Sequence, residues 1–251
     1  GIMLGKKRII VTGAAQGIGA SLAEGFAKMG ASVALADIRD PTDAVHRIKE
    51  RKGAANGISM DVTSLSDCER LVSETETAFG GVDGLVNNAA LFAALPIQGF
   101  NEISENLWDQ VMAVNVKGAW LCVRAAVPAM ERAGGGSIVM ISSNRIFHGY
   151  PGMLHYDASK GAVLAMARSL IRELGPSNIR VNTIAPGLTM SEGVLARPGI
   201  EERAAEIVAS RSLARSQIPE DLVGATAFFL SDAAEFVTGQ SLSVDGGGNI
   251  H

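Results

Sequence analysis

The 251-residue sequence is poor in cysteine, poor in aromatic residues and free of long runs of like charge. Its two cysteines, Cys68 and Cys122, are too few and too isolated in the sequence for a disulfide framework or a metal cluster, so we expect reduced thiols, as in a cytoplasmic protein. Lysine and arginine number 22 against 26 acidic residues, and the basic run Lys6-Lys7-Arg8 is short. This charge balance argues against nucleic acid as a partner.

The sequence also lacks a recognisable membrane or export signal. No apolar run reaches about 18 residues, and a basic, strand-like segment begins within about ten residues of the start. We therefore expect no membrane partner and a cytoplasmic location. Residues 1–7 are interpreted as an N-terminal tail, in which Gly1-Ile2 before Met3 looks like a cloning remnant.

Linkers and repeats are missing as well. The eight prolines are scattered, and no low-complexity tract or fixed-period repeat interrupts the chain. Residues 1–251 are therefore expected to form a single domain.

The sequence does contain short apolar, β-rich segments that alternate with longer amphipathic ones. Strands are continuously hydrophobic when helices cover both faces of a parallel sheet. The alternation predicts an α/β fold with a Rossmann-like, doubly wound parallel sheet, which binds ligands at the carboxyl ends of its strands. The strands are predicted at residues 8–11, 32–36, 56–60, 84–87, 137–141, 180–184 and 241–244. A helix is predicted from Leu65 to Phe79, where Ser66 and Glu69 have the spacing of a capping box.

A glycine-rich turn, TGAAQGIG at residues 12–19, follows the first predicted strand. Glycines let the turn tighten and let a pyrophosphate approach the backbone, while the following helix offers free N–H groups at its start. A mere tight turn is the alternative. The strand-turn-helix context, without a following Gly-Lys-Ser/Thr, favours a dinucleotide over a P-loop nucleotide. The cofactor-binding residues predicted here are Gly13, Gln16, Gly17, Ile18 and Gly19.

Asp37 ends the second predicted strand at the spacing expected for a carboxylate that binds the adenosine ribose. A 2′-phosphate would meet its negative charge, and the nearest cation, Arg39, comes two residues later. We therefore expect NAD as the cofactor rather than NADP, with Ile38 also at the cofactor. The alternative is a helix-capping or surface aspartate.

The stretch YDASK, residues 156–160, puts Tyr156 and Lys160 four residues apart and therefore on one face of a helix. A phenol of pKa about 10 is a poor base at neutral pH, but a nearby ammonium and a cationic nicotinamide both favour the phenolate. Taken alone, the five residues fit equally well the start of an amphipathic helix whose lysine extends to solvent.

Several further motifs accompany this pair: DV at 61–62, NNAA at 87–90, Asn115, SS at 142–143, PG at 186–187 and FVTGQSLSVDGG at 236–247. With the glycine spacing, they resemble the short-chain dehydrogenase/reductase (SDR) family over almost the whole chain. The resemblance implies a seven-strand sheet of order 3-2-1-4-5-6-7 and hydride transfer between a nicotinamide and a small secondary alcohol or ketone. It also implies a homotetramer, built partly from helices around residues 113–132 and 156–174.

The resemblance implies a role for each matching residue. Tyr156 would be the general acid/base, Lys160 would bind the nicotinamide ribose, and Ser143 would bond the substrate oxygen, with Ser142 as its neighbour. Asn115 would help to hold a water in a proton relay, at a break in a long helix. The remaining cofactor contacts that it implies are Asp61, Val62, Asn87, Asn88, Ala89, Pro186 and Gly187, with either Thr189 or Ser191 at the nicotinamide carboxamide.

Substrate specificity is expected in the segment 188–212 and in the loops after Asn88 and Ser143. The candidate substrate residues are Phe92, Arg145, Tyr150 and Leu188. Arg145 has two interpretations: a guanidinium that grips a substrate carboxylate or phosphate, or a solvated or salt-bridged loop arginine. The side chains of Phe92, Phe147 and Met153 fit either an apolar substrate pocket or ordinary core.

Two other classes of function explain the sequence less well. A non-catalytic NAD-binding regulator has little reason to retain Ser143, Tyr156 and Lys160 together. A methyltransferase that uses adenosylmethionine explains neither the Tyr156–Lys160 pair nor the terminal VDGG. The spacing of His148, His155 and His251 matches no metal-binding motif, so no metal is expected and these residues are interpreted as pocket wall, rim or chain end.

Overall fold

The computed structural model describes residues 3–250, and its centre is a seven-stranded parallel sheet. The strand order is β3-β2-β1-β4-β5-β6-β7, and all six neighbouring pairs are parallel. The strands are β1 Arg8–Thr12, β2 Ser32–Asp37, β3 Ala54–Ser59, β4 Gly84–Asn87, β5 Gly136–Ile141, β6 Ile179–Pro186 and β7 Ser241–Val244. The seven predicted strands and the predicted order are confirmed.

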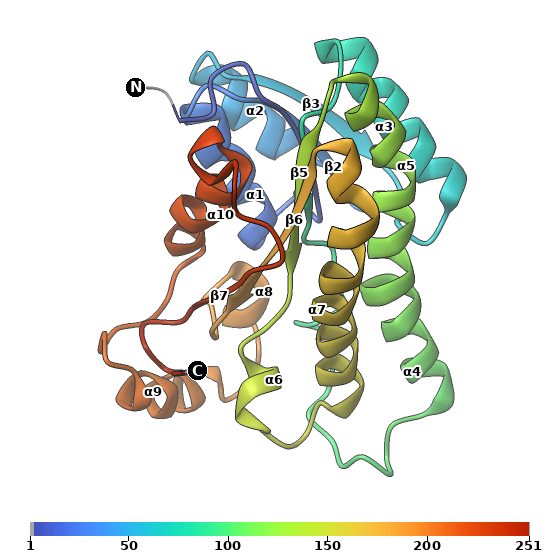
Figure 1. The fold of residues 1–251 in the computed structure, drawn as a ribbon. Helices are drawn as coiled ribbons and strands as arrows, with labels where there is room; N and C mark the ends of the chain where they lie inside the picture. The colour runs from blue at the N-terminus through green and yellow to red at the C-terminus, as the bar shows by residue number, and fades with distance from the viewer. Residues whose placement is uncertain (1–2, 251) are drawn as a thin grey trace.

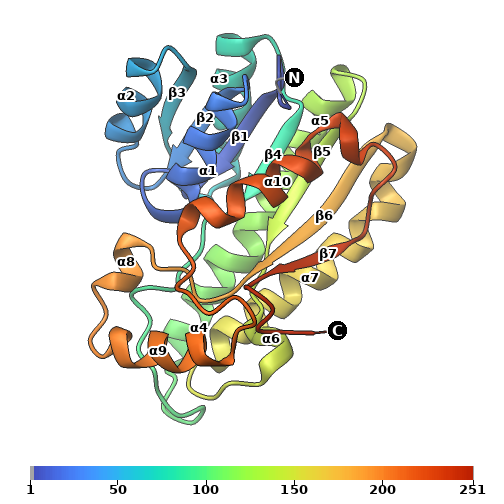
Figure 2. The same ribbon diagram turned by 90° about the vertical axis from the view of Figure 1, so that its left-hand side faces the viewer.

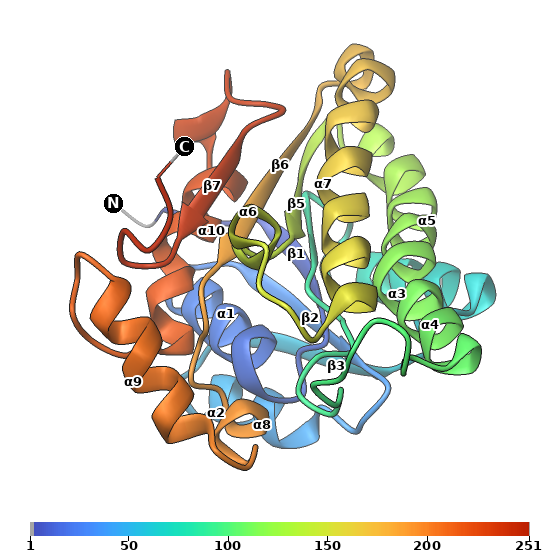
Figure 3. The same ribbon diagram turned by 90° about the horizontal axis from the view of Figure 1, so that it is seen from below.

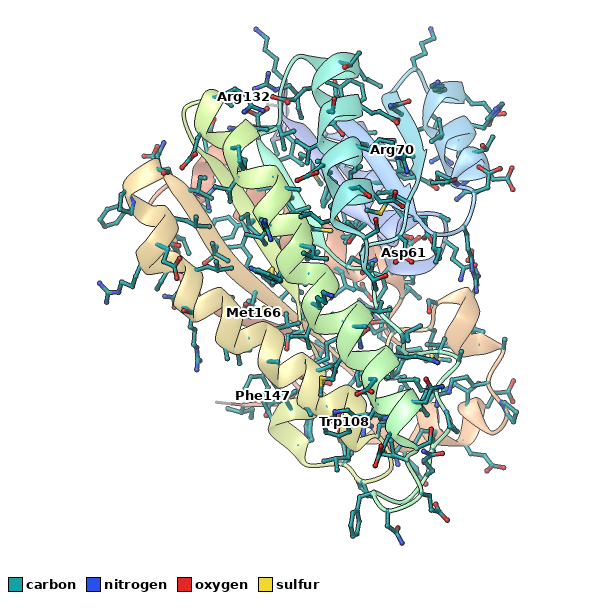
Figure 4. All side chains as sticks on the ribbon, turned by 90° about the vertical axis from the view of Figure 1, so that its right-hand side faces the viewer. Asp61, Arg70, Trp108, Arg132, Phe147 and Met166 are labelled. Atoms are coloured by element: carbon teal, nitrogen blue, oxygen red, sulfur yellow. The ribbon has the colours of Figure 1, made fainter. Side chains whose placement is uncertain are left out.

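Helices cover both faces of the sheet (Figure 1). One layer contains α1 (Gly17–Lys28), α2 (Thr42–Glu50) and α10 (Val223–Leu230). The other contains α3 (Leu65–Phe79), α5 (Ala119–Arg132) and α7 (Leu154–Leu174), with α5 and α7 side by side in Figure 4. The remaining helices α4 (Glu105–Met112), α6 (Arg145–His148), α8 (Glu192–Leu195) and α9 (Ile200–Ser210) lie towards the carboxyl ends of the strands.

The hydrophobic core consists of two layers of side chains, one on each face of the β-sheet. Successive strand residues point to opposite faces, so Val11 packs towards the α1 and α10 layer while its neighbour Ile10 packs towards the α3 and α5 layer. All four residues of β4 are buried. Each fully buried aliphatic side chain contributes about 1.5–3 kcal/mol to the stability of the fold. Burial of both faces of the strands therefore explains why the strand sequences are continuously apolar.

The predicted bounds of α3 are confirmed, but its predicted capping box is wrong. Ser64, not Ser66, is the N-cap: its backbone is extended, and its Oγ accepts a hydrogen bond from the Asp67 N–H at 3.3 Å. The helix begins at Leu65, so Ser66 already has helical geometry and cannot cap it.

A continuous helix runs from Glu105 to Arg132 through α4, a π-helix at Ala113–Gly118 and α5. By length and composition it is apolar enough to cross a membrane, although polar residues such as Asn115, Lys117 and Arg124 interrupt it, so the expectation that no uninterrupted apolar run reaches about 18 residues is unaffected. A core helix passes the same test, and α5 packs against α3. This single helix is therefore weak evidence for a membrane span.

The carboxyl ends of the strands gather at the lower edge of the sheet, which Figure 3 shows from below. There β1 leads into the glycine-rich turn, β5 into α6, and β6 into the segment with α8 and α9 (Figure 2). A cavity of about 440 Å³, called here the main cavity, opens among these connections.

Candidate active site

The glycine-rich turn joins β1 to α1 under close backbone packing. Gly17 has φ +61°, a conformation that side chains with a Cβ rarely adopt. A Cβ on Gly19 would overlap the Gly13 carbonyl and would lie 2.7 Å from Asn88 Nδ2. The N-cap residue Gln16 makes no side-chain capping bond, which leaves the first turn of α1 open to an anion from another part of the chain or from a ligand.

A carboxylate of the chain itself reaches this turn. The N–H of Gly17 donates to Oε2 of Glu192 at 3.3 Å, and the neighbouring Ser191 Cβ lies 3.5 Å from where a Gly17 Cβ would be. The segment after β6 therefore closes over the start of α1.

Asp37 lies beside the turn, at the end of β2. Its Oδ2 accepts from the Ala15 N–H and its Oδ1 from the Arg39 N–H, both at 3.0 Å. The next side chain, Ile38, is 73% exposed and offers an apolar surface at the same edge. The Asp37 carboxylate thus stands at the end of β2, in contact with the glycine-rich turn.

Asp61 and Val62 follow β3. Oδ1 of Asp61 accepts from the N–H and the hydroxyl of Thr63 at 2.9 and 2.8 Å, which orders the loop. Val62 is buried, and a Cβ on Gly118 would lie 2.6 Å from its Cγ2, so this loop packs directly on the π-helix.

At the end of β4, neighbouring asparagines point in different directions. Asn87 is buried and donates to the Ala119 carbonyl and to Met140 Sδ, so its amide is engaged in the core. Asn88 donates to the carbonyls of Thr12 and Gly13 and lines the main cavity. The Ala89 N–H donates to Thr12 Oγ1 at 3.0 Å.

Asn115 lies inside the π-helix, which agrees with the expected break in a long helix. Its Oδ1 accepts from the Leu91 N–H at 2.7 Å, and its Nδ2 donates to the Leu91 carbonyl and to Ser159 Oγ. These bonds fix the loop after β4 against α7.

Ser143, Tyr156 and Lys160 converge on the main cavity from β5 and α7. Ser142 also lines this cavity, and its hydroxyl donates to the Lys160 carbonyl at 2.9 Å. Lys160 Nζ lies 5.7 Å from the centre of the Tyr156 ring and donates to the Ile141 carbonyl at 2.8 Å. The predicted trio is therefore assembled around one cavity.

Burial shifts the pKa values of two members of this trio, Tyr156 and Lys160. Burial raises the pKa of Tyr156 well above its usual value, although Ser143 and then the charge of Arg145 act in the opposite direction. Burial also lowers the pKa of Lys160 to about 8. In the chain without a cofactor, burial of the phenol thus outweighs the effects of Ser143 and Arg145; the expected stabilisation of the phenolate also depends on a cationic nicotinamide.

Many of the predicted site residues line the main cavity. They are Ile18, Asn88, Phe92, Ser143, Arg145, Tyr150, Tyr156, Lys160, Pro186, Gly187, Leu188, Thr189 and Ser191. Sequence reasoning missed Arg197, Arg203 and Arg211, which also line it and lie inside the predicted specificity segment 188–212. Their position in that segment was the only indication in the sequence that they line the cavity. An arginine in a loop is otherwise as compatible with a solvated surface as with a cavity wall.

Aromatic and sulfur side chains form one wall of the cavity. The Phe92 ring centre lies 4.8 Å from that of Tyr156, and Met153 belongs to the same buried cluster. Both residues therefore serve as cavity lining and local core together. Phe147, a residue of α6 that Figure 4 labels, is not among the described lining residues.

Arg145 is salt-bridged, as the second interpretation held. Its Nε and Nη2 donate to the two carboxylate oxygens of Asp157 at 2.8 and 3.0 Å. Nη2 also donates to the Tyr150 carbonyl at 3.2 Å. The guanidinium borders the cavity with its charge already paired.

The histidines and cysteines show no metal arrangement. Within residues 3–250, no cluster of three or more histidine, cysteine or acidic side chains is placed to hold a metal ion. His148 lines the cavity and stacks on Tyr150 at 4.9 Å, whereas His155 is buried and His251 lies outside the described residues. The two free thiols, expected to be isolated, are buried with their sulfur atoms 3.7 Å apart.

Comparisons with known proteins agree with this geometry. Residues 13–249 match the sequence model of a family described as enoyl-(acyl carrier protein) reductase. The chain is 39% identical to an uncharacterized oxidoreductase of Thermotoga maritima, over 96% of each chain. It is 38% identical to a 3alpha-hydroxysteroid dehydrogenase of Mediterraneibacter gnavus, over 98% of each.

A solved structure shares the same fold. A putative short-chain alcohol dehydrogenase from Sinorhizobium meliloti 1021 superposes with a TM-score of 0.90 and 32% identity, covering 98% of this chain and 97% of its own. The family match, the relatives and the strand order lead to one conclusion: the chain belongs to the short-chain dehydrogenase/reductase family of oxidoreductases.

Proposed function

We propose that the protein is an NAD(H)-dependent oxidoreductase acting on a secondary alcohol or ketone. The observation that carries the proposal is the convergence of Ser143, Tyr156 and Lys160 on one cavity beside the glycine-rich turn. A bound nicotinamide dinucleotide would supply the hydride donor or acceptor.

Tyr156 is the proposed general acid/base. Its phenol, whose pKa is raised by burial, is protonated at neutral pH and can donate a proton to a carbonyl oxygen. In the oxidative direction the phenol must lose its proton, and the charge of a bound cofactor and of Lys160 is the proposed source of that stabilisation. Ser143 would hold the substrate oxygen within reach of the phenol.

The turn and Asp37 fit a dinucleotide. The close packing at Gly19 and the start of α1, which has no side-chain cap from Gln16 and where the Gly17 N–H already binds the Glu192 carboxylate, fit a phosphate cradle, and Asp37 at the end of β2 fits a contact to the ribose hydroxyls. We propose NAD over NADP because the Asp37 carboxylate would repel a 2′-phosphate.

The other proposed cofactor contacts follow the strand ends. Asp61 and Val62 would border the adenine, Asn88 and Ala89 the ribose side, and Pro186 and Gly187 the nicotinamide. With its amide engaged in the core, Asn87 would contribute through its backbone. Of the two hydroxyls, Thr189 is the better candidate for the carboxamide, because Ser191 lies at the glycine turn and hence near the phosphates.

Asn115 is proposed to act in the proton relay through its backbone. Both side-chain groups already have partners, whereas a π-helix displaces main-chain carbonyls from regular bonding. We also propose a homotetramer in a cytoplasmic setting. The partly exposed Trp120 on α5 and Leu154 on α7 lie on the helices expected at its interface.

The proposal is tested by turnover. Purified protein is incubated with NAD, or separately with NADP, and a panel of secondary alcohols, polyols, hydroxy acids and aromatic alcohols, while NADH or NADPH absorbance is recorded. We expect reduction of NAD with at least one class. Absence of turnover across the panel, with NADH binding retained, would instead support a non-catalytic dinucleotide-binding protein.

A further inference from the structure

The main cavity carries more positive charge than the proposed reaction requires. Its cationic lining residues are Arg145, Lys160, Arg197, Arg203 and Arg211. Among residues 3–250, no aspartate or glutamate belongs to this lining. The proposed chemistry uses Lys160, which leaves four arginines to be explained.

Two of these arginines are committed to the protein. Arg145 is paired with both oxygens of Asp157. Arg211 is 7% exposed and donates to the carbonyls of Leu188 and Arg215, at 2.9 and 3.2 Å. Their donors hold loops together, so neither guanidinium is free to bind a ligand.

Arg197 and Arg203 differ in this respect. Within the described part of the chain, Arg197 has one hydrogen-bond partner, the Leu95 carbonyl at 3.0 Å from Nη2, although a guanidinium has five N–H donors. Arg203 pairs with Glu206 at 3.5 Å, and the two side chains are 43% and 72% exposed. Such an exposed pair contributes little and is easily exchanged for another anion.

Arg197 also lies close to the reaction centre. Its Cζ is 5.3 Å from the centre of the Phe92 ring, which in turn packs at 4.8 Å on Tyr156. Burial, followed by the nearby charge of Arg145, lowers the pKa of Arg197, yet a guanidinium stays charged at physiological pH. The charge of Arg197 is thus only partly compensated, and the Phe92 ring lies between this guanidinium and the Tyr156 phenol.

We propose that Arg197, assisted by Arg203, binds an oxyanion group of the substrate, so that the substrate is an anionic alcohol or ketone with an apolar body. This inference rests on the proposed function, because it places the reacting carbon at Tyr156. The apolar body lies against Phe92, and the oxyanion, a carboxylate or a phosphate-like group, lies at the planar guanidinium. The substrate must therefore be long enough to pass the Phe92 ring.

The cofactor does not account for these arginines. Its pyrophosphate is assigned to the turn at Gly13 and Gly17, and its adenosine ribose to Asp37 at the end of β2. Arg197 instead contacts Phe92 and Leu95, in the loop between β4 and α4. The spare positive charge is therefore on the substrate side of the cavity.

A matched set of ketones tests the proposal. The probes are 4-acetylbenzoate, its methyl ester and 4-acetylphenylphosphonate, each assayed with NADH. We expect kcat/KM of the wild type to be about 10- to 100-fold higher for one of the anions than for the neutral ester. Which of the two anions has the higher kcat/KM shows whether the site prefers a carboxylate or a phosphate-like group.

Variants then identify the residue responsible. Arg197→Met should lower the anion-to-ester ratio of kcat/KM about 10- to 100-fold, Arg203→Met should lower it less, and Arg197→Lys should retain part of it. The control is Arg215→Met, since Arg215 is exposed, pairs with Asp221 and lies outside the cavity lining. A wild-type ratio near one, or a ratio unchanged in both methionine variants, overturns the inference.

Failure of the inference is distinguishable from failure of the proposed function. Turnover of the ester without any preference for an anion would leave the oxidoreductase intact and discard the anion site. If no ketone is turned over, calorimetric titration of 4-acetylbenzoate and its ester into wild type and Arg197→Met decides. Tighter binding of the acid, lost in the variant, supports the site, and equal binding of both probes rejects it.

Discussion

The two sides of the main cavity are built by different means. On the side where we propose that the cofactor binds, the glycine turn and Asp37 are held mainly by contacts to the backbone, such as the Ala15 N–H on the Asp37 carboxylate. On the substrate side, the walls are side chains fixed by partners far away in sequence, as with Arg197 on the Leu95 carbonyl. The cofactor side needs particular backbone conformations and therefore tolerates few substitutions. On the substrate side, a single side-chain substitution can change which ligand is bound.

The sharpest way to separate the two sides is Tyr156→Phe. Removing the hydroxyl should lower kcat by about 10²- to 10⁴-fold, because the proposed proton donor is lost. NADH affinity, measured by fluorescence titration, should change less than about threefold, since the phenol acts on the substrate. Retained turnover would contradict the assignment of Tyr156.

The converse variant is Asp37→Ala. It removes a charge-assisted bond to the ribose of about 1.5–3 kcal/mol, so NADH should bind about 10- to 100-fold more weakly. Discrimination against NADPH should narrow at the same time because the repelling charge is gone. The control is Glu50→Ala, an exposed acidic residue at the end of α2. An NADPH affinity of the wild type that equals its NADH affinity would argue against this role.

Lys160 joins the two sides, and its burial predicts a pH effect on stability. Its pKa is lowered from 10.5 to about 8 in the folded chain. Between these values the unfolded chain binds a proton that the folded chain does not, so the wild type should gain stability as pH rises through this window. Below about pH 8 the buried ammonium is protonated in both states and its desolvation destabilises the fold.

Lys160→Met should remove that dependence. We expect its Tm relative to wild type to be highest below about pH 8 and to fall by several degrees by about pH 10.5. The lost bond to Ile141 lowers the variant at every pH and leaves the slope unaffected. Lys49→Met, in the exposed face of α2, is the matched control. Parallel Tm curves for wild type and Lys160→Met would show that the ammonium is not desolvated.

The smallest expected effect concerns Glu192, where the substrate segment touches the cofactor turn. Its carboxylate accepts from Gly17, at the place where a pyrophosphate would bring negative charge. Glu192→Gln should therefore tighten NADH binding about two- to threefold, more at low salt than at high salt. Glu201→Gln on α9 removes the same charge elsewhere and should leave the affinity unchanged. Weaker NADH binding by Glu192→Gln would show that the carboxylate assists the cofactor instead.

Local pattern in the sequence was enough for the strands, for the glycine turn and for the bounds of α3, because burial on both sheet faces and backbone shape act over short distances. The sequence pattern did not predict features that depend on a partner distant in the sequence or on a boundary shift of one or two residues. Asp157 as the partner of Arg145, the sulfur contact of Cys68 with Cys122, and the burial that raises the pKa of Tyr156 all depend on tertiary packing. The cap of α3 was misplaced by two residues because several hydroxyls stood near its start.

In the π-helix at Ala113–Gly118, deletion of one residue should be more damaging than a substitution. Each residue advances a helix by about 100°, so one extra residue turns the following helix onto a different face. Before it, Val111 packs in the cluster with Tyr156, and after it, Cys122 packs against the sheet and α3. Deleting a single residue here would misalign one of these contact sets even if every side chain were kept. A gap in this stretch, when relatives are aligned, would accordingly mark a rebuilt cavity wall rather than a neutral change in length.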